Sequence, residues 1–179
     1  NLVELTGNFT TPAATPVAVI ADNGTQVTAA FVDQGTTNHV LHKFQITISA
    51  ATTNLTGLTF VTTGTYITAD ITNLRVRYST DATLDGADII LGTLTSPAIA
   101  GSKSLGLTTQ TLPIGISYIF ITADISATAT VGNTIGINAV TTGNLVLTTG
   151  TIKSGTTIAA GFQTIRPSAP IVPTGFTKG

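Results

Sequence analysis

The side chains of this chain that could do chemistry are few, and the densest group is a cluster of three carboxylates. They are Asp81, Asp85 and Asp88, in the segment STDATLDGADII. Carboxylate oxygens are preferred ligands of Ca²⁺, and Gly86 would allow a tight turn between them. The spacing differs from an EF-hand loop, which needs carboxylates on alternate residues and a terminal glutamate. The same aspartates would also cap turns in a solvated loop, so both readings stay open.

The two histidines are the next candidates for a metal or catalytic site. His39 and His42 are three positions apart in a segment that alternates like a strand. An odd spacing on a strand sends side chains to opposite faces, so we do not expect them to chelate one ion. His42 shares its predicted face with Phe44 and Ile46, which indicates a buried, hydrogen-bonded histidine.

The sequence contains no arrangement typical of an enzyme. It has no Gly-x-Ser-x-Gly elbow to hold a reactive serine, and Glu4 is its one glutamate. Asp70 and Asp124 each precede an isoleucine at the predicted end of a strand, where they are expected to cap turns. The absence of cysteine excludes disulfides and thiolate metal sites. We therefore predict a protein that is not an enzyme and has no cofactor, with Ca²⁺ as the one hypothesis to test.

The elements that position these side chains are predicted to be strands. Asn38–Ala50 alternates clearly, with Val40 and His42 on one face and Leu41 and Lys43 on the other. Ten such segments follow one another with turn residues between them, and none has a helical period. They are Gln26–Asp33, Asn38–Ala50, Gly57–Val61, Thr72–Ser79, Ile89–Leu94, Ser102–Thr109, Ile116–Ile125, Thr134–Val140, Asn144–Thr148 and Thr156–Ile165. The pattern predicts an all-β fold, an antiparallel β-sandwich that is Ig-like or jelly-roll-like.

One segment, Leu112–Ile135, indicates where the middle of that sandwich lies. Tyr118 and Phe120 point to one face, and Ile119 and Ile121 to the other. A strand that is apolar on both faces belongs inside a two-layer β-structure.

Composition excludes several classes of function. Only 8% of residues are charged, against about 25% in an average soluble domain, and threonine makes up roughly a fifth. A net charge of −1 gives no field that would attract nucleic acid. No apolar run is long enough to insert into a membrane.

Because the chain has no methionine, we expect a processed protein that is extracellular or at the cell surface after removal of an export signal. The Asn-x-Thr sequons at Asn8, Asn23 and Asn54 are predicted glycosylation sites.

The span from about Val40 to Val140 resembles the β-sandwich modules of secreted bacterial proteins related to the N-terminal domain of BNR-repeat neuraminidases. The resemblance rests on one strand and the link after it, and on the segment Asn73–Gly92 upstream. The matching residues are Leu112, Gly115, Tyr118, Phe120, Asp124, Ile125, Ala129, Gly132 and Asn133. The resemblance implies an exported, non-catalytic sandwich. It does not imply sialidase activity, because the Asp-box repeats of the catalytic propeller need tryptophan and this chain has none.

The ends of the chain suggest how the protein would act. We predict an extended N-terminal arm over residues 1–15, a β-sandwich over 16–166 and a tail rich in proline and glycine over 167–179. The apolar side chains of the arm could complete the sheet of another copy, as in donor-strand fibres. They are Leu2, Val3, Leu5 and Phe9. The sequence thus predicts a subunit of a pilus-like extracellular homopolymer. The alternative is a non-catalytic module for adhesion or for binding glycans, and the arm could also pair within its own sandwich.

Overall fold

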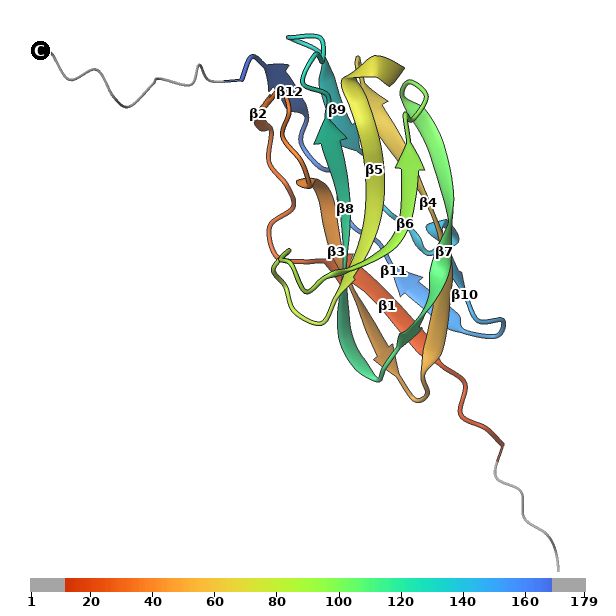
Figure 1. Cartoon of the computed structure of the whole chain (residues 1–179). Helices are drawn as coiled ribbons and strands as arrows, with labels where there is room; N and C mark the ends of the chain where they lie inside the picture. Colours follow the sequence, from red (N-terminus) through yellow and green to blue (C-terminus); the bar gives the residue numbers. More distant parts are fainter. Residues whose placement is uncertain (1–11, 169–179) are drawn as a thin grey trace, which may run out of the picture.

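The structure is a computed structural model that describes residues 12–168. These residues form two β-sheets that enclose one apolar core, so the predicted all-β sandwich is confirmed (Figure 1). The first sheet, sheet A, has the order β11-β1-β3-β8-β5-β6. Its strands are β1 (Val17–Asp22), β3 (His39–Ser49), β5 (Ile71–Ser79), β6 (Ile89–Thr95), β8 (Gly115–Ile125) and β11 (Ile152–Gly155).

The second sheet, sheet B, has the order β10-β4-β9-β12-β2, with β7 also paired to β4. Its strands are β2 (Ala30–Asp33), β4 (Thr53–Gly64), β7 (Gly101–Leu112), β9 (Thr134–Ile137), β10 (Leu145–Leu147) and β12 (Gln163–Arg166). Two single-turn 3₁₀ helices, η1 (Thr68–Asp70) and η2 (Thr142–Asn144), precede β5 and β10. No helix within residues 12–168 has the length and apolar character needed to cross a membrane.

Both sheets are mixed rather than wholly antiparallel. β1 pairs in parallel with β11, and β2 pairs in parallel with β12. Each parallel pair joins a strand from the start of the chain to one from its end. Alternation within a strand cannot reveal such a partner, because the period of a strand is the same in both kinds of pair.

The central strand was predicted correctly. β8 lies between β3 and β5 in sheet A, and Ile119, Ile121 and Ala123 are fully buried in the core. Phe120 is also buried, yet it lies outside the core cluster, because it faces the opposite side of the sheet. Its cross-strand neighbours on that face are Lys43 and Arg77.

A β-bulge in β3 corrects the predicted faces of the histidine segment. The register between β3 and β8 shifts between Val40 and His42, so Leu41 and His42 are both fully buried. The extra residue also reverses the face to which the residues before the bulge point, relative to a regular strand. His39 pairs with Ala123 and His42 with Ile121, two core positions, so both histidines have cross-strand partners on the inner face, not opposite ones.

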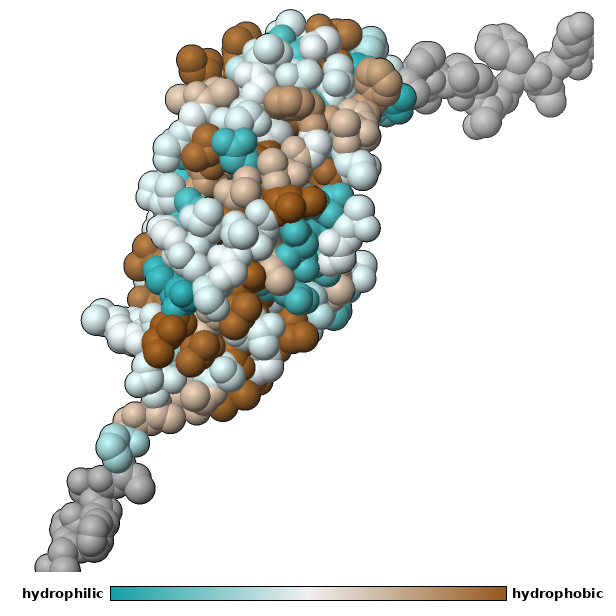
Figure 2. All heavy atoms as spheres, turned by 180° about the vertical axis from the view of Figure 1, so that it is seen from behind, coloured by the Kyte–Doolittle hydropathy of each residue, from teal (hydrophilic) through white to brown (hydrophobic). Residues whose placement is uncertain are grey.

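The chain enters and leaves the sandwich at opposite ends. Residues 12–15 are exposed and form no regular structure, and they lead away from the start of β1 at the bottom of Figure 1. The chain continues past β12 at the top of the same view. The reverse side, seen in Figure 2, is mostly pale with separate brown spots, as expected for a surface of threonine, serine and glycine.

Candidate functional site

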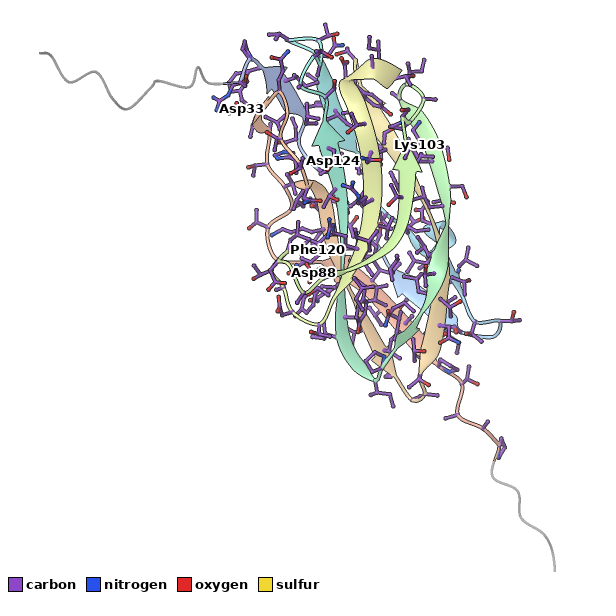
Figure 3. All side chains as sticks on the ribbon, in the orientation of Figure 1. Asp33, Asp88, Lys103, Phe120 and Asp124 are labelled. Atoms are coloured by element: carbon purple, nitrogen blue, oxygen red, sulfur yellow. The ribbon has the colours of Figure 1, made fainter. Side chains whose placement is uncertain are left out.

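An open hollow lies beside the first half of β3 in the described part of the molecule. It has a volume of about 700 Å³ and is lined by β3, by the β1–β2 loop and by the loop after β5. Its lining includes Val27, His39, Val40, Lys43, Leu84 and Phe120. Figure 3 shows Phe120 on β8, close to the loop that carries Asp88. We call this hollow the β3 cavity.

The β3 cavity exists because β1 is shorter than the strand that it pairs with. β1 covers β3 only from Ser49 to Phe44, whereas β8 covers the other side of β3 as far as His39. On the β1 side, the stretch from His39 to Lys43 therefore has no partner strand among residues 12–168. His39 lies opposite Ala123 on the inner face of sheet A, and Val40 lies opposite Thr122 on the outer face. Both line the cavity, because it lies at the edge of β3.

A glutamine side chain takes the place of a strand at one point along this edge. Gln26 accepts a hydrogen bond from the backbone N–H of Lys43 and donates one to the carbonyl of Lys43, at 3.1 and 2.9 Å. The side chain thus imitates the two bonds of a neighbouring strand. The backbone from His39 to Leu41 has no such substitute among residues 12–168.

Basic side chains gather on the outer face beside the β3 cavity. Arg75 forms an ion pair with Asp124 at 2.5 Å, and Arg77 donates a hydrogen bond to the side-chain oxygen of Asn38. Neither Lys43 nor Arg77 takes part in an ion pair within residues 12–168. A carboxylate from outside the described part could therefore pair with Lys43 without displacing an existing partner.

His42 is a structural histidine, as predicted. Its Nε2 lies 3.1 Å from the hydroxyl of Thr157 and 3.2 Å from the carbonyl oxygen of Ile158. Burial lowers the pKa of His42, and it outweighs the opposite effects of the Ile158 carbonyl and of Asp22. His39 has a different neighbour, the side-chain oxygen of Gln163 at 3.0 Å. The two histidines therefore share a face but not a ligand.

Asp70 and Asp124 bind turns and neighbouring strands, as predicted. The Asp70 carboxylate accepts hydrogen bonds from Ile67, Thr130 and Asn133. Burial would raise the pKa of Asp70, but these bonds outweigh it and lower the pKa. The pKa of Asp124 is lowered in the same way: burial opposes the shift, and bonds from Asn38, Asn73 and Arg75 prevail.

The aspartates of the predicted calcium site cap their own loop. Asp81 accepts a bond from the N–H of Thr83, Asp85 from that of Ala87, and Asp88 from that of Asp85. No group of three or more acidic, histidine or cysteine side chains that could hold a metal ion occurs within residues 12–168. Calcium binding stays a prediction that the geometry does not support.

The predicted sequons and arm residues differ in what the structure describes. Asn23 is buried and its amide donates a bond to the carbonyl of Ala82, so a glycan there would have to break a loop contact. Asn54 is half-buried, and its side-chain oxygen accepts a bond from Thr111. Asn8 and the arm residues lie outside the described residues. The latter are Leu2, Val3, Leu5 and Phe9.

Lys103 was not singled out by sequence reasoning. Its side chain is only 6% exposed, and its ammonium donates to the carbonyl of Ile99 at 2.8 Å. Burial lowers its pKa. The one available signal was its position in β7, where Lys103, Leu105 and Leu107 share a face.

Comparison with known proteins identifies no family. No family model matches the chain, and no curated protein matches it. A structure search finds a crystal structure of a CaDoc0917 variant in complex with CaCohA2 at pH 5.5. The match has 19% identity and a TM-score of 0.38, and it covers 84% of this chain and 100% of the other. A TM-score this low does not establish a shared fold.

Proposed function

We propose that this protein is a structural, non-catalytic subunit of an extracellular filament, in which the N-terminal arm of one copy adds a β-strand to the next. The observation that carries the proposal is the path of the chain. Residues 12–15 are exposed and lead out at the end of the sandwich opposite to the exit past β12 (Figure 1). A contact between the arm of one copy and another part of the next is head-to-tail, and when repeated without closure it makes a filament.

The apolar residues of the arm support strand donation. Within residues 12–168, the core cluster runs from Ala18 to Ile165. In the proposed filament, Leu2, Val3, Leu5 and Phe9 bind to the partner copy. Backbone pairing supplies affinity in this mode of association, and alternate side chains supply specificity.

The threonine-rich surface is compatible with life outside the cell. With 8% charged residues and a net charge of −1, little on the surface titrates or is screened by salt. We therefore place the proposed filament in an extracellular setting.

Microscopy of the purified chain tests the proposal. Negative-stain images of the full chain should show fibres, and deletion of residues 1–11 should leave a folded monomer without fibres. Circular dichroism of the deleted variant controls for folding. Fibres that persist after the deletion would contradict the proposal.

The β3 cavity favours a second candidate, a non-catalytic module that binds a glycan or another adhesion ligand. A cavity of about 700 Å³ lies in the range of small-molecule sites. Phe120 is its one aromatic lining residue, and at 2% exposure it offers little surface for sugar stacking. A full chain that stays monomeric and binds an immobilised glycan would support this candidate over the filament.

A further inference from the structure

We infer that the β3 cavity is the acceptor for the arm of a second copy, whose segment around Glu4 lies along the unpaired stretch His39–Leu41 of β3, with Glu4 beside Lys43. The inference rests on the proposed function and names the surface that the arm would use. Strand addition needs a free backbone edge, room for side chains and a reason for one register. The β3 cavity offers all three.

The free edge is the stretch of β3 that β1 does not reach. Ser49 to Phe44 pair with β1, and Gln26 satisfies Lys43, so the backbone of His39–Leu41 is open on that side. A strand placed here would continue the line of β1 and would have β3 on one flank and the loop around Val27 on the other.

The room for side chains is the cavity itself. Successive residues of an added strand point to opposite sides, so Val3 and Leu5 share one side and Glu4 takes the other. The cavity is lined by residues from both faces of sheet A, including His39 and Lys43, and can therefore receive both sides of such a strand.

Charge complementarity gives the register. Glu4 is the one glutamate of the chain and lies among the apolar residues of the arm. Lys43 lines the cavity and has no ion-pair partner within residues 12–168. A pair between Glu4 and Lys43 would add a directional contact to backbone pairing, and misplaced registers would lose it.

The position of the cavity favours a second copy over the chain's own arm. The arm leads to Val17, the first residue of β1, which lies opposite Ser49. The unpaired stretch of β3 begins at the other end of β1, beyond Asp22, which lies opposite Phe44. The chain's own arm would have to turn back and run past the six residues of β1, roughly 20 Å, before reaching the cavity. The arm of a neighbour can enter without such a reversal.

Charge reversal with mixing tests the inference. Glu4→Lys and Lys43→Glu should each reduce the pelleted fibre mass at least about tenfold relative to the wild type. An equimolar mixture of the two variants should restore it, because each arm then meets an opposite charge on the other variant. The same pair of changes in one chain should also restore it. Lys153→Glu, a charge reversal on β11 outside the cavity, is the matched control and should leave fibre mass unchanged.

Each outcome has a distinct meaning. Restoration in the double variant but not in the mixture would show that the arm docks on its own copy, and the inference fails. Single reversals without effect would also overturn it, while loss of fibres on deletion of residues 1–11 would leave the proposed function intact. Absence of fibres from the wild-type chain would refute both. Because Glu4→Lys changes no residue of the described sandwich, it remains informative even if Lys43→Glu does not fold.

Discussion

Two buried polar side chains, Asp70 and His42, form hydrogen bonds to segments that are distant in sequence. The Asp70 carboxylate connects η1 to the loop around Thr130 and Asn133. His42 connects β3 to Thr157 and Ile158, near the end of the described chain. A buried carboxylate or imidazole is costly unless it is bonded, so these contacts make the loops depend on the strands that they cover.

His42 predicts a pH dependence of stability. Its pKa is lowered in the folded state, so below its unfolded value of about 6.5 the unfolded chain takes up a proton that the folded chain does not. The free energy of unfolding should therefore fall as the pH drops from about 7.5 to about 5.5, by at most about 1.4 kcal/mol per pH unit from this group.

Urea unfolding over this range checks the prediction. The slope of stability against pH should flatten in His42→Gln relative to the wild type. Equal slopes in the variant and the wild type would show that His42 does not control the dependence.

At the scale of elements, the sequence identified strands that alternate over many residues. β3, β5 and β8 were predicted within one or two residues of their ends. β3 and β5 alternate between apolar and polar side chains, and β8 is a long run that is apolar on both faces. β1 was not predicted, since its six residues, VAVIAD, do not alternate in polarity. The predicted strand Thr156–Ile165 was wrong over most of its length, because that segment crosses between the sheets and only its end forms β12.

The candidate site could be predicted only in part. Lys43 was predicted on the face opposite to His42, as observed, and His42 was predicted to be buried. Leu41 was predicted to share the face of Lys43 but lies in the core. The unpaired stretch of β3 results from the unequal lengths of β1 and β3 and from the bulge after Val40. Both are properties of pairing between segments, which no pattern within a single strand records.

Gly155 lies where β1 and β11, the parallel pair of sheet A, come close to each other. Its φ is +85°, and a Cβ there would lie 2.1 Å from the carbonyl oxygen of Ile20. Gly155→Ala should lower the free energy of unfolding by about 2–4 kcal/mol, because it adds backbone strain to a steric overlap. Gly86→Ala, in open space, should change it by less than about 0.5 kcal/mol. Thermal unfolding of both variants makes the comparison, and similar midpoints would refute the close approach of β1 and β11.

At the scale of the whole molecule, the sandwich is complete in its core but incomplete at one edge. Within residues 12–168, the apolar cluster runs from Ala18 to Ile165, while the backbone of β3 has no partner strand beside the cavity. An open strand edge invites pairing with another chain, and proteins usually cover such edges. A subunit that polymerises by strand addition needs this combination, since it must fold before assembly and still offer one free edge.

The folding of the sandwich and the binding of the arm to the edge of β3 can be measured separately. The fragment of residues 12–168 should be a monomer that unfolds in one cooperative step, because it contains the whole cluster of buried residues from Ala18 to Ile165. A peptide of residues 1–11 should then stabilise the fragment, since a ligand that binds only the folded state adds about 2.7 kcal/mol at a hundredfold excess over its Kd. The same peptide with Glu4→Lys should stabilise less, because it places a positive charge beside Lys43. Thermal unfolding at increasing peptide concentration measures both effects. Equal stabilisation by the two peptides would keep strand addition and exclude the Glu4–Lys43 contact, whereas no effect from either would mean that the edge of β3 does not accept the arm.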